Sequence, residues 1–284
     1  MLGKLLKHEI SATARMFIPM YVVLIITSVV GKFFIWLTSK EAFIDSVPES
    51  FAMLVSALSS ILTILYSILI VAVLVATFIF IVMRFYKNLF TDEGYLMFTL
   101  PVKTPSLIVS KLISAVLWIL FSLVIVIISL VVIFYSGEIA NMLKEFWSSL
   151  TDYVARENFN FKDTYHVSMP TFAVELIILM LIALCANLLM IYSAIAMGSK
   201  FSSKSRVSGA VKAYLVIYIT TQIATSILMY ILFTVVPDFF GALSENQGDA
   251  IQSTIISTGS INIVFCGIYF YITNFFMKKR LNLD

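Results

Sequence analysis

The residues of this chain that could carry out chemistry are few, and the sequence keeps them apart. The two histidines are His8 and His166, and the two cysteines are Cys185 and Cys266. A zinc or iron site needs several such ligands at close spacing, which none of these positions provides. The motif G-x-x-x-x-G-K-[ST], whose backbone cradles nucleotide phosphates, does not occur. The sequence therefore predicts no catalytic residue, no metal site and no cofactor bound by this chain.

Six long apolar stretches make up most of the chain and set the positions of these residues relative to the membrane. About 20 apolar residues in a helix cross the roughly 30 Å hydrocarbon core of a bilayer. Spans are predicted at about residues 17–38, 57–83, 107–135, 171–197, 213–236 and 254–277. Hydrophobic residues make up 61% of the 284 positions and charged residues only 12%, which leaves no room for a second globular domain. We expect an all-α membrane protein with one transmembrane domain over residues 1–284.

The basic residues give an orientation for these spans. If both termini are cytoplasmic, fourteen of the nineteen Lys and Arg residues lie in the inside segments, as the positive-inside rule requires. This topology places the segment 84–106 inside and the loop 137–170 outside, with His8 and His166 on opposite faces. The net charge of +3 comes from the same bias and needs no nucleic-acid partner. Cys185 and Cys266 fall within spans, where they are predicted to be small buried residues without a disulfide.

Two segments outside the spans have helical patterns of their own. Residues 1–16 place apolar side chains near one helical face, which predicts an amphipathic elbow helix lying at the interface. A plain cytoplasmic cap on the first span is the alternative. Pro19 is expected to mark the turn into the membrane. In the loop 137–170, apolar residues recur at helical spacing and predict an external helix. They are Ile139, Met142, Leu143, Phe146, Trp147 and Leu150.

The inside segment 84–106 is the most informative polar stretch. Aromatic and aliphatic residues alternate there with charged ones, and Thr91 precedes two acids, as at a helix start. Pro101 and Pro105 end that helix before the third span. A short aromatic-rich helix beneath a membrane domain favours a docking role. Simple anchoring at the interface is the alternative.

The run Tyr86–Val102, which contains Asp-Glu-Gly-Tyr-Leu-Met-Phe-Thr-Leu-Pro-Val, resembles the permease subunits of ABC-type exporters. Together with the segment Met1–Arg15 and the six spans, it is most similar to type V exporters of low-GC bacteria, whose permease and ATPase are separate chains. The resemblance implies that the loop holds a cytoplasmic coupling helix, which docks in a groove of the ATP-binding subunit. Its docking residues would be Asp92, Glu93, Gly94, Tyr95, Leu96, Met97 and Phe98.

The same resemblance implies partners and a direction of transport. Two copies of an ATP-binding subunit would carry ATP and Mg, so this chain would be a transport subunit and not itself an enzyme. A second permease copy, identical or related, would complete a homodimer or heterodimer in the bacterial plasma membrane. The resemblance also implies export of an amphipathic substrate out of the cell. A peptide is favoured, with a drug or a lipid as alternatives.

Polar residues inside the spans are the remaining candidates, because each is unfavourable in lipid unless it meets a partner or a cavity. Glu175, Asn187, Gln222 and Asn262 are the candidates for a translocation path. Glu175 either lines the outer mouth of that path or reaches the interface, and the amides are otherwise contacts between helices. An ion-coupled secondary transporter needs carboxylates near the midplane, and the spans offer only Glu175, at an edge. A membrane scaffold or sensor without transport is the other alternative.

Overall fold

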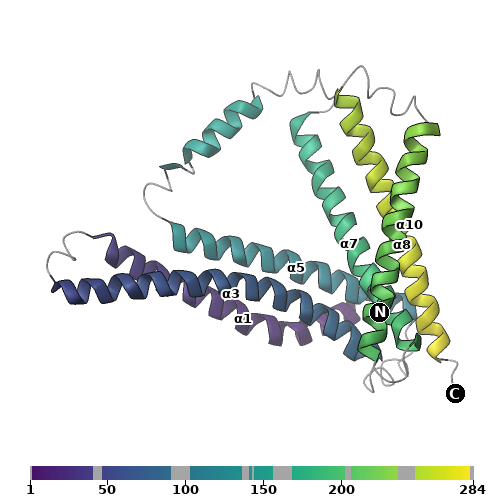
Figure 1. Ribbon diagram of the computed structural model, residues 1–284, viewed down its shortest axis with the longest axis horizontal. Helices are drawn as coiled ribbons and strands as arrows, with labels where there is room; N and C mark the ends of the chain where they lie inside the picture. The colour runs from purple at the N-terminus through teal and green to yellow at the C-terminus, as the bar shows by residue number, and fades with distance from the viewer. Residues whose placement is uncertain are drawn as a thin grey trace. The chain divides into compact units, whose positions relative to one another are not determined.

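The computed structural model is almost entirely helical over the part of the chain that it describes. That part comprises residues 2–40, 47–90, 103–135, 141, 142, 144–155, 168–201, 206–235 and 247–281. The long helices are α1 (Leu2–Thr38), α3 (Glu49–Phe90), α5 (Thr104–Phe134), α7 (Met169–Phe201), α8 (Arg206–Val235) and α10 (Gln247–Leu281), shown in Figure 1. Residues 144–155 form a further helix, which agrees with the helical spacing predicted for this loop.

All six long helices are long and apolar enough to cross a membrane. Their apolar windows are mostly unburied within the chain, since 6% to 28% of each window is covered by the rest of the protein. Large apolar side chains in such numbers are stable on a surface only where lipid surrounds them. The chain is therefore an all-α membrane protein, as predicted, and each predicted span falls on one of the six helices.

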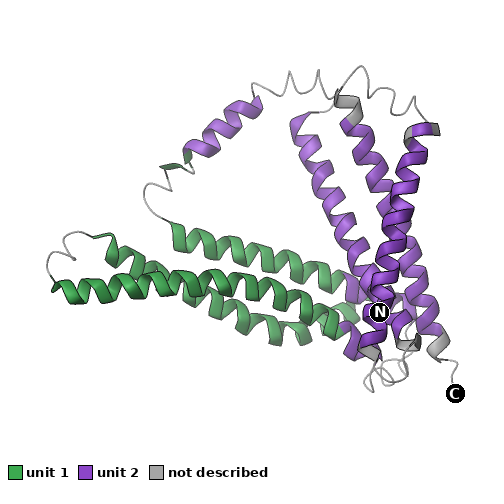
Figure 2. Ribbon diagram, in the orientation of Figure 1, with its two compact units in different colours: residues 1–84, 113–144 green, residues 85–112, 145–284 purple. Residues whose placement is uncertain are grey.

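The described chain divides into two compact units (Figure 2). Unit 1 comprises residues 1–84 and 113–144, and so contains α1 and most of α3 and α5. Unit 2 comprises residues 85–112 and 145–284, and so contains α7, α8 and α10. The last turns of α3 and the first turns of α5 belong to unit 2. Both segments that flank residues 91–102 therefore belong to the same unit as α7, α8 and α10.

Unit 1 is organised around one face of α1. The buried residues of this helix recur every three or four positions and form a single stripe, which consists of Glu9, Thr13, Phe17, Tyr21, Leu24, Ser28 and Gly31. A stripe with this period faces one side of an α-helix. Gly31 allows a close contact with α5, because a Cβ atom there would lie 3.2 Å from Cδ1 of Ile133.

Hydroxyl groups connect the three helices of unit 1 inside the apolar region. The hydroxyls of Tyr21 on α1 and Thr77 on α3 both hydrogen-bond to Ser122 Oγ on α5. Further along, the Tyr66 hydroxyl lies 2.9 Å from Ser129 Oγ, which links α3 to α5. Such bonds are the usual polar contacts between membrane helices, where lipid offers no alternative partner.

The first sixteen residues are helical, as predicted, but they are not a separate element. Helix α1 continues from Leu2 to Thr38 with Pro19 inside it. Pro19 is exposed, while Phe17 and Tyr21 on either side of it are buried. A proline is tolerated in a membrane helix when tertiary contacts hold the turns around it. Packing of the buried stripe therefore prevails over the local tendency of proline to end a helix.

In unit 2, α7 packs against both α8 and α10, and the three helices are labelled in Figure 1. The Thr221 and Tyr269 hydroxyls join α8 to α10 at 2.6 Å. Cys185 and Cys266 are both free thiols, as predicted, and both are half-buried. The Cys266 thiol lies 3.9 Å from the Ile182 carbonyl, a weak contact between α10 and α7.

Helices α7 and α8 approach each other closely at Gly198. A side chain at this position would overlap the backbone of Gly209 and Ala210 on α8. We expect Gly198→Ala to lower the free energy of unfolding by about 1 to 3 kcal/mol, because backbone atoms cannot move aside as a flexible side chain can. Unfolding of the purified protein by SDS, followed by circular dichroism, measures this difference.

Gly267 on α10 provides the matched control, since a Cβ atom there would meet nothing within 4 Å. Gly267→Ala should leave stability unchanged or raise it slightly, through the better helix propensity of alanine. Equal stabilities for the two variants would contradict the close contact of α7 with α8.

Candidate functional site among the membrane helices

The predicted docking residues Asp92, Glu93, Gly94, Tyr95, Leu96, Met97 and Phe98 lie outside the described residues. The candidate path residues Glu175, Asn187, Gln222 and Asn262 are all described, and all lie in unit 2. Lys32, in unit 1, donates a hydrogen bond from Nζ to the Tyr135 carbonyl at the end of α5. This contact resembles snorkelling, because the ammonium group reaches the polar end of a helix.

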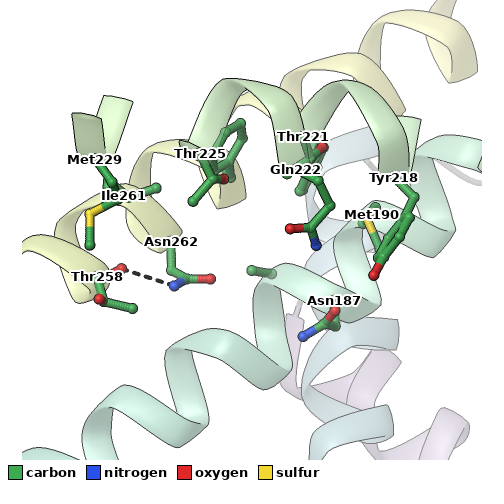
Figure 3. Close-up of a pocket in the computed structure, with 13 residues that line it drawn as sticks. Asn187, Met190, Tyr218, Thr221, Gln222, Thr225, Met229, Thr258, Ile261 and Asn262 are labelled. Atoms are coloured by element: carbon green, nitrogen blue, oxygen red, sulfur yellow. Dashed lines mark hydrogen bonds between the residues drawn. The ribbon is translucent and has the colours of Figure 1, made fainter. Parts of the chain in front are cut away.

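A pocket of about 240 Å³ lies among α7, α8 and α10 (Figure 3). The structure brings three of the four candidate path residues to this pocket, one from each helix: Asn187, Gln222 and Asn262. The other lining residues are Ala186, Met190, Tyr218, Thr221, Thr225, Met229, Thr258, Ile261, Phe265 and Tyr269. Figure 3 shows the side chains of Gln222 and Asn262 directed into the space between the helices.

The three amides keep hydrogen-bonding capacity for a ligand. Asn187 Nδ2 donates to the Ala183 carbonyl at 2.8 Å, and Asn262 Nδ2 donates to the Thr258 carbonyl at 2.9 Å. Each of these bonds lies within the side chain's own helix and uses one N–H group. An amide has two donors and one accepting oxygen, so both side chains retain an oxygen and an N–H group. Gln222 is exposed and has no hydrogen bond to any other described residue.

All three amides lie near the middle of their candidate spans. Those spans are Met169–Gly198, Ser208–Leu232 and Ile251–Lys278. Asn187, Gln222 and Asn262 are each within about one helical turn of the corresponding midpoint, given a rise of 1.5 Å per residue. Uncompensated amides at this depth are unfavourable, because hydrocarbon offers no hydrogen bonds. Their convergence on one pocket is therefore a functional indication.

Glu175 does not belong to the pocket. Its Oε2 atom accepts a hydrogen bond of 3.0 Å from Gln252 Nε2 on α10, and both residues lie within the first two turns of their helices. By the predicted topology this is the outer end of the bundle. The two alternatives for Glu175, the interface and the outer mouth of the path, both lie at this end of the bundle, and the Gln252 contact agrees with either.

The chemistry of the pocket is polar but uncharged. No Asp, Glu, Lys, Arg or His is among its lining residues, whereas amides, hydroxyls and aromatic rings all are. The hydroxyls of Thr221, Thr225, Thr258 and Tyr269 were not among the residues predicted from the sequence. Their signal in the sequence is helical spacing from the amides, since Thr225 follows Gln222 by three positions and Thr258 precedes Asn262 by four.

A second notable feature of unit 2 is a set of almost fully buried apolar residues on α3 and α5, which flank the segment 91–102, and on α7. We call it the base cluster and define it by Phe85, Leu89, Phe90, Leu107, Ile108, Leu188 and Tyr192, each at most 2% exposed. The Phe85 and Tyr192 rings stack with centroids 3.7 Å apart and planes 3° apart. The Thr104 hydroxyl donates to Asn274 Oδ1 at 2.8 Å and joins the start of α5 to α10.

Unit 1 contains an ion pair that sequence reasoning missed. Arg84 Nε lies 2.9 Å from Glu9 Oε2, and the two side chains are 22% and 8% exposed. Beside it, Trp118 Nε1 donates to Thr13 Oγ1 at 2.7 Å, and the Trp118 ring stacks on Phe17 with centroids 4.7 Å apart. The sequence signal that could have suggested this ion pair is the predicted topology, which places Glu9 and Arg84 on the same face of the membrane.

No family model, no curated protein and no solved structure matches this chain.

Proposed function

We propose that this chain is the transmembrane permease subunit of an ATP-driven ABC exporter. Its six-helix membrane architecture supports the proposal, as does the resemblance of Tyr86–Val102 to the coupling segment of such permeases. The absence of a phosphate-binding motif from the sequence is consistent with ATP hydrolysis on a separate subunit. Two such subunits and a second permease copy would complete the transporter in the bacterial plasma membrane.

The observation that carries this proposal is the base cluster. A segment that receives force from an ATPase must be attached to rigid elements, or its displacement is lost in local bending. Phe85 and Thr104 are anchored on the two sides of the segment 91–102, by stacking on Tyr192 of α7 and by a hydrogen bond to Asn274 of α10. Because closely packed side chains transmit displacement, a push on this segment would move the inner ends of α7 and α10.

The proposed direction is outward, and the proposed substrate is amphipathic. Both rest on the resemblance, and the uncharged pocket among α7, α8 and α10 is consistent with the substrate class. An amphipathic peptide is the favoured cargo, with a drug or a lipid as alternatives.

The docking role of the segment 91–102 is tested by replacing Glu93 and Tyr95, each with alanine. We expect each variant to insert normally and to bind the ATP-binding subunit more weakly. For the Tyr95 variant the loss should be roughly thirtyfold, since truncating a buried aromatic residue at an interface costs about 2 kcal/mol. The subunit is first identified by crosslinking to the tagged permease in the native host. The measurement is then a titration of the tagged permease with the free subunit.

Tyr153→Ala is the matched control, because Tyr153 is an exposed tyrosine in the helix 144–155, on the predicted outer side. It should bind the subunit like the parent. Parental affinity in both the Glu93 and Tyr95 variants would refute docking through this segment.

Orientation is checked by labelling intact cells with an impermeant thiol reagent, on a background lacking Cys185 and Cys266. We expect Asn158→Cys to react and Ser203→Cys to stay protected until the membrane is opened, because the basic residues around Ser203 hold that loop inside. The opposite pattern would place the docking segment on the wrong face for ATP.

A further inference from the structure

We propose that the pocket among α7, α8 and α10 binds an uncharged, amide-bearing part of an amphipathic ligand, about the size of one capped amino-acid residue. As a substrate site, it rests on the proposed export function. As a binding site, it depends only on the residues around the pocket.

The hydrogen-bonding groups of the pocket match those of a peptide unit. Asn187 and Asn262 each use one N–H group within their own helix, and Gln222 has no hydrogen bond to another described residue. The free groups therefore include both acceptors and donors, as in the N–H and C=O groups of a peptide. A ligand amide could hydrogen-bond to a donor and an acceptor of the pocket at once. These bonds would replace the hydrogen bonds that hydrocarbon cannot offer to the three side chains.

The absence of charge from the pocket lining selects against ionised ligands. A carboxylate or an ammonium group would enter the middle of the membrane without a partner of opposite charge, which is strongly unfavourable. Glu175, a carboxylate of this bundle, is bonded to Gln252 and does not line the pocket. The pocket therefore favours the neutral part of a ligand whose charged groups, where it has any, remain at the interface.

The size and walls of the pocket limit the ligand further. A cavity of about 150 Å³ in another protein holds benzene, so a pocket of about 240 Å³ accommodates a group about one and a half times as large. Met190 and Phe265 supply apolar lining, against which an aliphatic side chain can pack. One aliphatic residue with an amide on each side meets these conditions.

The test uses the full-length chain in lipid nanodiscs, without an ATP-binding subunit. The probe is N-acetyl-leucinamide carrying a photoreactive diazirine in its side chain, and labelled residues are located by mass spectrometry. The competitors are unlabelled N-acetyl-leucinamide, cationic leucinamide and anionic N-acetyl-leucine, which share the leucine side chain and differ in charge.

We expect labelling on α7, α8 and α10 around the pocket, with competition by the neutral compound alone. Replacing Gln222 and Asn262 together with leucine should lower labelling about tenfold, because two amide partners are lost. Gln252→Leu is the matched control, since it removes an amide of the same bundle outside the pocket, and it should label like the parent.

Three results would overturn the proposal: parental labelling in the double variant, equal competition by a charged compound, or a double variant that changes the oligomeric state. The last would identify the amides as contacts between two copies of the chain. Because no ATPase is present, labelling is independent of docking. A failed docking test with intact labelling would refute docking through the segment 91–102 and leave the pocket's ligand class standing.

Discussion

Replacing Arg84 with alanine is expected to lower the free energy of unfolding by about 3 kcal/mol, because it removes the guanidinium group that pairs with a buried carboxylate. Arg84 Nε lies 2.9 Å from Glu9 Oε2, and the Glu9 side chain is only 8% exposed. The measurement is SDS-induced unfolding of the purified protein, compared with the parent.

A double-mutant cycle separates this effect from lost packing. Removing both charges, with Glu9→Ala and Arg84→Ala together, should cost clearly less than the sum of the two single losses. Arg15, an exposed arginine of the same helix α1 as Glu9, is the matched control, and Arg15→Ala should change stability by no more than about 0.5 kcal/mol. Additive losses in the cycle would mean that the pair does not couple α1 to α3.

Replacing Trp118 with alanine should destabilise the protein by about 2 to 3 kcal/mol. Trp118 is buried, stacks on Phe17 and donates a hydrogen bond to Thr13. In a soluble core this truncation costs about 3 to 5 kcal/mol. In a membrane, part of that cost is absent because the unfolded helices are surrounded by lipid and not by water. The lost van der Waals contacts and the lost hydrogen bond remain.

Two variants divide the Trp118 effect into its parts. Trp118→Phe keeps an aromatic ring against Phe17 but loses the donor to Thr13, and should cost about 1 kcal/mol. Trp147→Ala removes a tryptophan that is 66% exposed, and should change stability by no more than about 0.5 kcal/mol. An unfolding curve for Trp118→Ala that matches the Trp147→Ala curve would refute this packing.

The sequence alone determined the number and approximate bounds of the membrane helices. Each span is a local property: about 20 successive apolar residues are long enough to cross the bilayer, whatever the rest of the chain does. The helix 144–155 could be predicted for the same reason, because its periodicity is read within a few turns. The end of the first helix segment at Pro19 was predicted by an equally local rule. It was wrong because packing on both sides of the proline continues α1.

The sequence could predict the individual residues of the candidate site, but not that they meet at one pocket. Asn187, Gln222 and Asn262 were each identifiable as polar residues in apolar spans, since their burial in lipid is unfavourable wherever they point. Whether they face one another depends on the rotation and depth of three helices, and on close approaches such as the one at Gly198.

Tertiary structure alone decided which residues became partners. Asn187, Gln222 and Asn262 meet at one pocket, while Glu175 pairs with Gln252 instead. The bond from Arg84 to Glu9 joins residues 75 positions apart, and the stacking of Phe85 on Tyr192 spans a longer interval still. The length and periodicity of an apolar stretch are local properties and can be read from the sequence. These contacts join separate helices, so they are decided only when the helices pack together.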